Sequence, residues 1–512
     1  MENKNSIKKY FKGKNIFLTG GSGFLGKALI EKLLRSCPEL GTIYILLRPK
    51  KGKGLQERLE NITSCPLFDL LKKSNPESIK KIVPVNGNTA ELGLGLSSED
   101  RQLLITKVHM FYHVAASVKF DDALKDAIFV NVRSAREAAL LALEMKHLEF
   151  HMHVSTTYCN IDGKKEIEEI LYPSHGNWKE AIEAAESCDP QTFDVLAQKY
   201  IGTFPNTYTF TKLLAEHCVN ELLVGKVPTI ICRPSVVVST ILEPFEGWID
   251  NFNGPVGLLL AGGSGLLRTV YGGRKVDTDY IAVDNVVKLM ITAGWHKVNY
   301  SNKDELSIYH ASKYNQVANN QEQLVKLGKR LYWDVPFAKK IWFPGNTMTH
   351  CWYNYFINVL LFHMIPAVMV DLLLRAFGYK PFLFKIQRKI YIGNMAVSYF
   401  MLNEWWFINT KSFSLLEFIP ENEMIDFNFK VMPVGDQAIY QYYAKSCDYA
   451  RKHLLMEKGD ISEETRVRTR RMYYLDRTMR YLFYALAVWT VLFKINILKV
   501  ICGIICKYIG NL

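Results

Sequence analysis

The stretch NIFLTGGSGFLGKALIEKLL, Asn15–Leu34, decides the expected fold. Its apolar start predicts a buried strand that ends at Thr19. The next segment, Phe24–Arg35, repeats leucine at every fourth position and predicts a helix that Cys37-Pro38 closes. Glycines between a strand and a helix permit a tight turn and let backbone N–H groups approach a diphosphate, which the helix dipole also favours. The stretch therefore predicts the turn of a Rossmann-like dinucleotide site.

The glycines of this turn can be grouped in two ways. Gly20, Gly23 and Gly26 give TGxxGxxG, whereas Gly21, Gly23 and Gly26 give GxGxxG. The first spacing resembles that of the extended short-chain dehydrogenase/reductase superfamily. A plain glycine turn is the alternative, but the strand and the helix lie where a cofactor site needs them. The residues expected to bind the cofactor here are Thr19, Gly20, Gly23, Phe24, Leu25 and Gly26.

Short apolar strands alternate with helical patterns through the first half of the chain. This alternation predicts an α/β fold, a Rossmann-like doubly wound parallel sheet with helices on both faces. A further helix is expected over Asn131–Lys146. The candidate strands are Asn15–Thr19, Thr42–Leu47, Ile82–Val85, Val108–Val114, His151–Ser155 and Thr229–Cys232.

Beyond about residue 320 this rhythm ends and aromatic residues become dense, which predicts a mainly helical C-terminal domain. The expected units are a reductase domain (1–345) with a substrate-binding portion, a C-terminal domain (346–465) and a basic segment with a hydrophobic tail (466–512). Phe356–Phe377 is very apolar but is interrupted by polar residues and a proline. It is either a buried pair of core helices or a membrane-dipping hairpin, and the interruptions favour the buried core.

The last segment of the chain suggests a membrane anchor. Tyr481–Leu498 is long enough to span a bilayer if Lys494 snorkels. The arginines that precede it would keep the catalytic domain in the cytosol. An amphipathic or core helix is the alternative. These arginines are Arg466, Arg468, Arg470, Arg471, Arg477 and Arg480.

Composition excludes several classes of protein. The 512 residues favour two domains, and 49% hydrophobic with 22% charged residues is typical of a folded chain. The net charge of +13 comes without a DNA- or RNA-reading motif, so we expect anionic ligands or a membrane surface and no nucleic acid. Ten scattered cysteines form no CxxC pair and no zinc spacing, which favours free thiols and no metal. The polar N-terminus has no apolar core of a secretory signal.

The end of the second strand decides which dinucleotide such a fold prefers. An NAD enzyme usually has an acidic residue there, which binds the ribose 2′-hydroxyl. This chain instead reads LRPKK over 47–51. Because Arg48 suits a 2′-phosphate and no acidic residue repels one, the expected cofactor is NADPH. A solvated basic loop is the alternative.

A candidate catalytic pair follows the fifth strand. Tyr208 and Lys212 form YxxxK, and residues four apart share one face of a helix. The lysine would lower the pKa of the phenol and also hold the nicotinamide ribose, while Tyr208 protonates a carbonyl oxygen. A hydroxyl for the developing oxyanion is expected at the end of the fifth strand. The resemblance to the superfamily implies Thr156 for this role, with Ser155 as the second candidate. A pair on a helix surface is the alternative.

Three other stretches lie near the expected site. By resemblance to the short-chain dehydrogenase/reductase superfamily, His113–Ala116 looks like the stretch that passes under the cofactor, with Ala115 in contact. In the same way, Arg233-Pro234-Ser235 looks like the turn that flanks the nicotinamide, with Pro234 and Ser235 in contact. The insert Cys159–Asn206 is longer than in most short-chain reductases. It would form a lid, a wall of the substrate channel or a plain surface excursion. Its first cysteine has no paired base, which favours a structural role.

Longer blocks of sequence point to one family. GKNIFLTGGSGFLGKALIEKLLRSCP, HVSTTYCN, PNTYTFTKLLAE, ICRPSVV and EPFEGWIDNFNGPVGLLLAGGSGLLR resemble the alcohol-forming fatty acyl-CoA reductases, over nearly the whole chain. The run GWIDNFNGP, Gly247–Pro255, is far more specific than the glycine turn. Two features depart from the family pattern and concern cofactor or substrate tuning. Asn88 stands where an acid is common near the adenine, and Gln437–Tyr443 lacks a tryptophan.

The resemblance implies NADPH-dependent reduction of long-chain fatty acyl-CoA to a primary alcohol, with release of CoA and a bound aldehyde between two reductions. It also implies a role in wax or ether-lipid synthesis at a peroxisomal or endoplasmic reticulum membrane. The chain ends without an SKL-type signal. A membrane-bound dehydrogenase for a sterol or another alcohol or ketone is the runner-up, and a catalytically dead binding module is a third reading. A homo-oligomer remains open.

Overall fold

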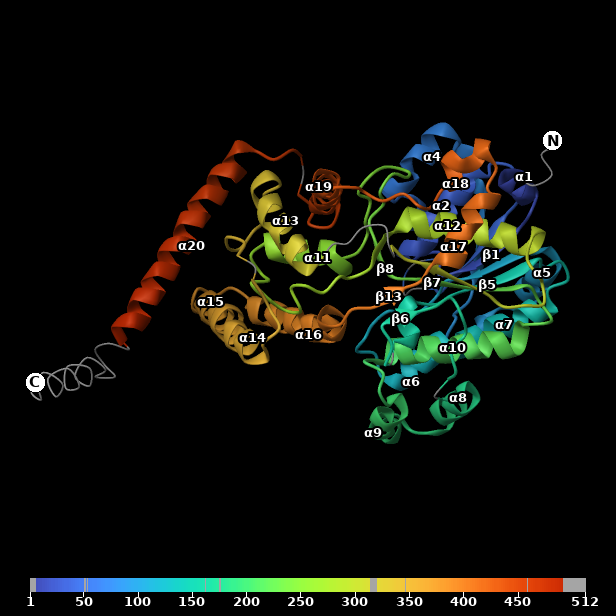
Figure 1. Cartoon of the computed structure of the whole chain (residues 1–512), viewed down its shortest axis with the longest axis horizontal. Helices are drawn as coiled ribbons and strands as arrows, with labels where there is room; N and C mark the ends of the chain where they lie inside the picture. The colour runs from blue at the N-terminus through green and yellow to red at the C-terminus, as the bar shows by residue number, and fades with distance from the viewer. Residues whose placement is uncertain are drawn as a thin grey trace, which may run out of the picture.

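The structure is a computed structural model that describes residues 6–490, apart from 50, 51, 53, 162, 175, 314–319, 346 and 458. Its centre is a seven-stranded sheet in which all neighbouring strands are parallel (Figure 1). From one edge to the other the strands are β11 (Ser307–Ala311), β7 (Thr229–Pro234), β5 (Phe150–Val154), β4 (Met110–His113), β1 (Ile16–Thr19), β2 (Ile43–Leu47) and β3 (Ile82–Asn86). The predicted α/β class is confirmed.

Six of these strands coincide with predicted ones, with ends that shift by two residues or fewer. The chain adds β2 and β3 on one side of β1 and then returns to place β4 on the other side. The carboxyl ends of β1 and β4 therefore diverge into a crevice, where doubly wound sheets bind their ligands. The seventh strand, β11, was not predicted, because its short run is interrupted by the buried polar residue His310.

Helices cover both faces of the sheet (Figure 1). α2 (Phe24–Ser36) and α12 (Val283–Asn299) pack together on one face. The predicted helix Asn131–Lys146 begins as a π-helical turn, Ile128–Arg133, which continues into α7. The opposite face is covered by α5 (Ser98–Lys107), α7 (Ser134–Glu144) and α10 (Thr207–Leu223). Each face thus buries its own apolar cluster, and the sheet is held rigidly between them.

The insert 159–206 packs against the outside of this body. Its two helices, α8 (Trp178–Ser187) and α9 (Pro190–Ile201), bury Trp178 and Phe193 in a cluster with Phe210 of α10. Earlier in the insert, β6 (Glu166–Ile167) pairs with β13 (Trp406–Phe407) from the C-terminal part of the chain. The insert therefore joins two parts of the chain that are distant in sequence.

The C-terminal part is mainly helical, as predicted. Its strand β12 (Thr347–Thr349) pairs with β9 (Thr269–Tyr271), so strands from both sides of the predicted boundary at 345/346 share a sheet. The domain boundaries stay predictions. The helices are α13 (Gln321–Asp334), α14 (Trp352–Val359), α15 (Ile365–Ala376), α16 (Leu383–Leu402), α17 (Thr410–Ser414), α18 (Met424–Phe427), α19 (Asp436–His453) and α20 (Glu463–Trp489).

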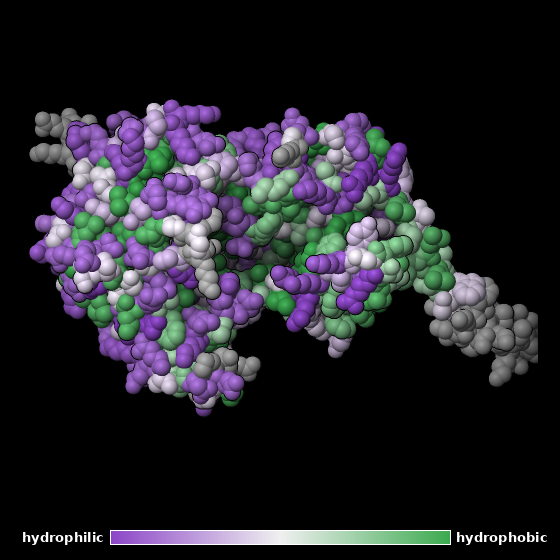
Figure 2. Space-filling model, turned by 180° about the vertical axis from the view of Figure 1, so that it is seen from behind, coloured by the Kyte–Doolittle hydropathy of each residue, from purple (hydrophilic) through white to green (hydrophobic). Residues whose placement is uncertain are grey.

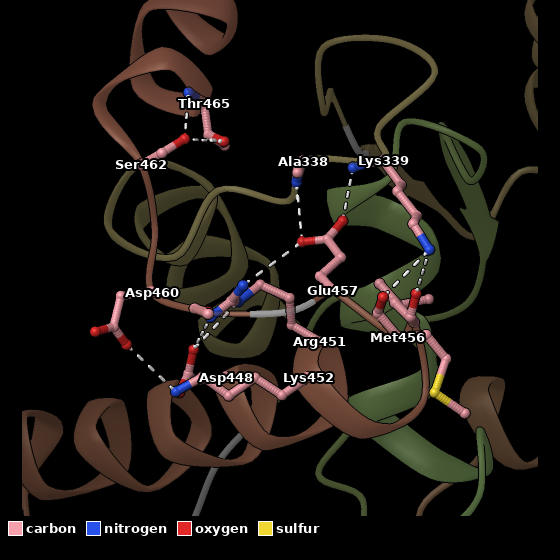
Figure 3. Close-up of polar contacts among 12 residues, drawn as sticks. Ala338, Lys339, Asp448, Arg451, Lys452, Met456, Glu457, Asp460, Ser462 and Thr465 are labelled. Atoms are coloured by element: carbon pink, nitrogen blue, oxygen red, sulfur yellow. Dashed lines mark hydrogen bonds and ion pairs between the residues drawn. The ribbon is translucent and has the colours of Figure 1, made fainter.

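Polar contacts attach the segment that leads into α20 to the body of the protein (Figure 3). Glu457 accepts hydrogen bonds from the backbone N–H groups of Ala338 and Lys339, at 3.0 and 2.6 Å. Arg451 lies 3.8 Å from Glu457 and forms an ion pair with Asp448 at 2.8 Å. These contacts join the end of α19 to the loop after α13, so the long helix starts from an anchored position.

The expectation that Phe356–Phe377 forms a buried core is wrong. α14, a π-helical turn (Leu360–Met364) and α15 form one helix, Trp352–Ala376, with a mean hydropathy of 2.1 and only 22% of its apolar window buried. By length and composition this is the one helix in the described part of the chain that could cross a membrane. The interrupting residues His363 and Asp371 are buried instead, so the polar side chains face the protein.

Candidate active site

One large cavity, of about 1560 Å³, begins at the glycine turn and extends to the C-terminal helices. The ends of β2, β4 and β5 and the start of α10 line its first part. Its far part lies between α11 (Gly254–Gly263) and α16. The cavity therefore joins the crevice of the sheet to a space walled by helices.

Two glycines of the turn are required by close contacts. Gly20 has a φ of +78°, and a Cβ there would lie 2.7 Å from the backbone nitrogen of Ala115. A Cβ on Gly26 would lie 2.2 Å from the carbonyl oxygen of Gly20. Only glycine suits position 20, because the backbone there is left-handed and there is no room for a side chain. Since Gly20 belongs to the TGxxGxxG grouping and not to GxGxxG, the geometry favours TGxxGxxG. Gly23 caps the N-terminus of α2, where a diphosphate would meet free N–H groups.

Thr19 holds this turn to the neighbouring strand. Its Oγ1 lies 2.8 Å from Nδ1 of His113 and accepts a hydrogen bond from the backbone N–H of Ala115 at 3.3 Å. Thr19 is fully buried and does not line the cavity, whereas Gly20, Gly23, Phe24, Leu25 and Gly26 do. The structure therefore places Thr19 behind the turn.

Two arginines lie at the end of β2. Arg48 is exposed and lines the cavity, as does Arg58 from α3 (Leu55–Thr63), whose guanidinium donates a hydrogen bond to the carbonyl oxygen of Arg48. Arg58 was missed in the sequence because only the fold brings α3 beside this loop. Asn88 also lines the cavity there, with its amide bonded to Glu91. A pair of cations thus faces the place where the ribose of a dinucleotide is expected.

Tyr208 and Lys212 both line the cavity from the first turns of α10. Lys212 is buried, and its Nζ donates a 2.6 Å hydrogen bond to the carbonyl oxygen of Val154. Burial lowers the pKa of Lys212 to about 8, although the negative charge of Glu216 opposes this shift. Burial also raises the pKa of Tyr208, while a hydrogen bond with Thr156 acts in the opposite direction. The expectation that Lys212 lowers the pKa of this phenol is therefore wrong, because burial outweighs any such effect and the phenol stays protonated at neutral pH.

The two hydroxyl candidates at the end of β5 point to different partners. Thr156 interacts with Tyr208 and donates a 3.4 Å hydrogen bond to the carbonyl oxygen of Pro234. Ser155 lines the cavity as well, but its hydroxyl lies 3.8 Å from the sulfur of Cys159. Thr156 is thus the better placed of the two for a substrate oxygen.

A buried carboxylate lies one helical turn beyond Lys212. Glu216 accepts two hydrogen bonds from the guanidinium of Arg233, at 2.8 and 2.6 Å. It also accepts a hydrogen bond from the thiol of Cys159 at 3.2 Å. Burial raises the pKa of Cys159, so the residue is a neutral thiol and a poor nucleophile. Glu216 was not predicted, and Arg233 was expected only as part of the turn beside the nicotinamide and not as the partner of a buried carboxylate; the only signal for Glu216 was its i, i+4 spacing from Lys212.

The residues predicted to flank the nicotinamide also line this cavity. Ala115 follows β4, and Pro234 and Ser235 follow from the end of β7. The hydroxyl of Ser235 donates a 2.6 Å hydrogen bond to Asp279. Burial raises the pKa of Asp279 to about 6. The loops after β4, β5 and β7 therefore meet around Tyr208.

The far part of the cavity is mainly apolar. Near Tyr208 it is bordered by Phe120, Tyr158 and Phe400, whose rings lie 5.2 to 5.8 Å from one another or from Tyr208. No described residue of the insert 159–206 lines the cavity, which does not support the alternative that the insert forms a wall of the substrate channel. Farther on, the apolar lining side chains are Leu258, Ala261, Leu266, Leu267, Ile386, Ile390, Val397 and Met401, and the polar ones are Ser264, Lys389 and Asn394.

The GWIDNFNGP block connects both parts of the cavity. Trp248 is fully buried and stacks on Phe24, with ring centroids 4.8 Å apart, and Asp250 forms an ion pair with Lys27 of α2. The block then begins α11, which walls the apolar part. Within the described residues there is no cluster of three or more His, Cys, Asp or Glu side chains that could hold a metal ion.

Comparison with known proteins identifies the family. Residues 18–290 match an NAD-binding family model described as Male sterility protein, and residues 362–457 match a second model, Sterile, with the same description. Fatty acyl-CoA reductase 1 of Rattus norvegicus is 36% identical over 465 residues, which cover 88% of this chain and 87% of that protein. The chain belongs to the fatty acyl-CoA reductase family. Fatty acyl-CoA reductase wat of Drosophila melanogaster is 33% identical, with 96% and 93% covered.

Solved structures agree with the fold of this fatty acyl-CoA reductase family member. The terminal R domain from the myxalamid PKS-NRPS biosynthetic pathway superposes with a TM-score of 0.57 at 19% identity, covering 87% of this chain and 94% of that domain. The reductase domain of a nonribosomal peptide synthetase from Mycobacterium tuberculosis gives 0.57 at 15% identity, covering 89% and 96%. The sequence resemblance is confirmed, and the expectation of a nicotinamide cofactor is supported by the family model.

Proposed function

We propose that this protein reduces long-chain fatty acyl-CoA to a primary alcohol, with NADPH as the reductant. The observation that carries the proposal is the single cavity that connects the glycine turn, the group of Tyr208, Lys212 and Thr156, and an apolar arm between α11 and α16. An acyl chain needs such an arm beside the reacting carbon. Membership of the fatty acyl-CoA reductase family supports the same substrate class.

The residues of the cofactor site support the choice of NADPH in this proposal. Gly20 and Gly26 allow the close backbone approach that a diphosphate requires, and a side chain at either position would fill the space. Arg48 and Arg58 present two guanidinium groups at the end of β2, which suits a 2′-phosphate. When bound, the nicotinamide supplies the hydride. Lys212, Ala115, Pro234 and Ser235 would hold the nicotinamide end.

The side chains of the site have distinct roles in this reaction. The Thr156 hydroxyl binds the substrate oxygen as negative charge develops on it, and the Tyr208 phenol donates a proton to that oxygen. The positive charge of Lys212 stabilises the phenolate that remains. Two hydrides and two protons convert the thioester into a primary alcohol and free CoA thiol. The first reduction breaks the carbon–sulfur bond, and the aldehyde stays bound for the second.

The location follows from the substrate and the C-terminal helix. Long-chain acyl groups partition into bilayers, so a membrane anchor keeps the enzyme near its substrate. We expect the tail to serve as this anchor at the peroxisomal or endoplasmic reticulum membrane, with the catalytic part in the cytosol. Of the expected span, Tyr481–Trp489 belongs to α20, and 491–498 lie outside the described residues. A role in wax or ether-lipid synthesis fits the alcohol product.

The test uses the purified full chain with NADPH and acyl-CoA substrates of different lengths. Oxidation of NADPH together with release of CoA thiol supports the proposal. The runner-up function, a membrane-bound dehydrogenase for a sterol or another alcohol or ketone, shares the glycine turn and YxxxK. Turnover of a sterol without CoA release at any chain length would favour that dehydrogenase.

A further inference from the structure

The helix Trp352–Ala376 shows an apolar face to solvent. Side chains along its whole length are between 36% and 59% exposed, far more than in a core helix. The exposed residues are Phe356, Ile357, Leu360, Leu361, Ile365, Val368, Met369, Val370, Leu372 and Leu373. Figure 2 shows hydrophobic surface gathered on this part of the molecule, next to the C-terminal end. Apolar surface of this extent marks a binding face.

The polar residues of the same helix attach it to the protein. Nε2 of His363 accepts hydrogen bonds from the backbone N–H groups of Arg268 and Thr269, at 3.1 and 3.2 Å. Asp371 accepts three backbone N–H groups at the start of α16, from Phe382, Leu383 and Phe384, at 2.9 to 3.0 Å. The helix therefore cannot separate from the body to cross a bilayer without leaving these buried groups unpaired. One face stays on the protein and the other is free.

The turn between α15 and α16 has the composition of a membrane interface. Phe377 and Tyr379 are 76% and 67% exposed at its tip, and Phe382 follows at 47%. Between Asp371 and Glu404 the chain carries five cations and no acidic residue. They are Arg375, Lys380, Lys385, Arg388 and Lys389, which are all exposed. Arg375 also interacts electrostatically with Asp371, one helical turn earlier, and Lys389 also lines the cavity. Aromatic rings and exposed cations beside an apolar face match the headgroup region of an anionic bilayer.

The apolar face continues onto α20. Phe362 and Phe483 lie against each other, with ring centroids 6.3 Å apart. Asp476 binds Arg268 and Arg480, both at 2.8 Å, so α20 is fixed beside the same strand that receives His363. The face of the hairpin and the start of the tail therefore point toward one surface.

We propose that the hairpin α14–α16 inserts into one leaflet of an anionic bilayer, as a contact separate from the tail and lying along the membrane. The partner is a lipid surface, because apolar side chains, interfacial aromatics and cations occur together. α16 also lines the cavity through Ile386, Ile390 and Val397. The contact thus brings the apolar arm to the bilayer, so that an acyl chain enters beside α16. This entry route rests on the proposed function, whereas the membrane contact does not.

The test uses the full chain in anionic vesicles that contain a phospholipid with a photoactivatable group in its acyl chain. After illumination, adducts are mapped by mass spectrometry. The proposal expects adducts on α14, α15 and the turn before α16, in addition to the tail. It expects none at Val195 or Ile425, which are 81% and 84% exposed on other surfaces. Adducts confined to residues beyond Arg480 would overturn it, as would equal labelling of the hairpin in neutral vesicles at high salt.

A matched pair of variants separates lipid contact from folding. Leu372→Glu with Leu373→Glu changes two side chains that are each 58% exposed, and Val434→Glu changes one that is 80% exposed elsewhere. The double variant should lose hairpin adducts by about tenfold or more, since charges are costly in a bilayer, whereas Val434→Glu keeps them. Unchanged adducts in the double variant would refute the contact.

Activity then distinguishes the two proposals. With a short, water-soluble acyl-CoA, the double variant should keep the kcat/KM of the native protein, which also shows that it folds. With a long-chain acyl-CoA held in vesicles, its KM should rise several-fold. An unchanged KM for the vesicle-held substrate would refute the entry route. If the native protein reduces neither substrate, the proposed function fails while the adduct map still decides the membrane contact.

Discussion

The carboxylate of Glu216 and the guanidinium of Arg233 form a fully buried ion pair, with Oε2 2.6 Å from Nη2. This pair joins α10, one turn after Lys212, to the end of β7, directly before Pro234. Burial alone would raise the pKa of Glu216, but the charge of Arg233 outweighs it and the pKa is lowered. The two elements that carry Lys212 and Pro234 are therefore locked together by charge.

Replacing Glu216 by alanine should destabilise the protein by about 3–5 kcal/mol, because Arg233 is left as an unpaired buried charge. Chemical denaturation of the full chain in detergent measures the change. Glu77→Ala is the control, since Glu77 forms an exposed ion pair with Lys80 and its loss should cost less than about 1 kcal/mol. Similar losses in both variants would show that the buried pair has no special role.

Replacing Tyr208 by phenylalanine should reduce turnover by about 10²–10⁴-fold, because the proton donor to the substrate oxygen is lost. Binding of NADPH should change little, since the ring remains. Steady-state kinetics and a fluorescence titration of NADPH give the two readings. Tyr158→Phe serves as the control, because Tyr158 lines the same cavity and packs on Phe400. A fully active Tyr208→Phe protein would rule out the proposed mechanism.

Replacing Arg48 by alanine should weaken NADPH binding by about 10–100-fold, which corresponds to one charge-assisted hydrogen bond of about 1.5–3 kcal/mol. NADH lacks the 2′-phosphate, so its affinity should hardly change. Dissociation constants for both cofactors are compared, and Arg101→Ala on α5 is the control for loss of a surface cation. Equal losses for NADPH and NADH would contradict the assignment of the 2′-phosphate.

The pH profile should report the protonation of Lys212. Burial lowers its pKa to about 8, so the side chain is charged below that pH and neutral above it. Since the phenol of Tyr208 has a raised pKa and stays protonated, kcat/KM should fall as pH increases beyond about 8. Measurements between about pH 6 and 10 test this. In Lys212→Arg the group remains charged, and the decline should disappear at reduced overall activity; a flat profile in the native protein would exclude this role.

The sequence predicts the central sheet well because parallel strands are buried on both faces and appear as apolar runs, as at Ile16–Thr19 and Ile43–Leu47. It also identifies the glycine turn and YxxxK, whose geometry is local. The position of Arg58 beside Arg48 and the pairing of Glu216 with Arg233 could not be predicted. In each case the two residues lie on different elements, which come together only in the fold. The wrong expectation of a buried core at Phe356–Phe377 has the same origin. His363 and Asp371 are buried because they accept hydrogen bonds from Thr269 and from the start of α16, and the sequence does not show these contacts.

The most direct test of the account is the number of hydride equivalents that reach one carbon. The full chain is given palmitoyl-CoA and NADPH that carries deuterium at the transferred position, and the product is analysed by mass spectrometry. Two reductions at one site predict hexadecanol with two deuterium atoms on its first carbon and one CoA thiol released per alcohol. A product with one deuterium, or no release of CoA, would contradict the account.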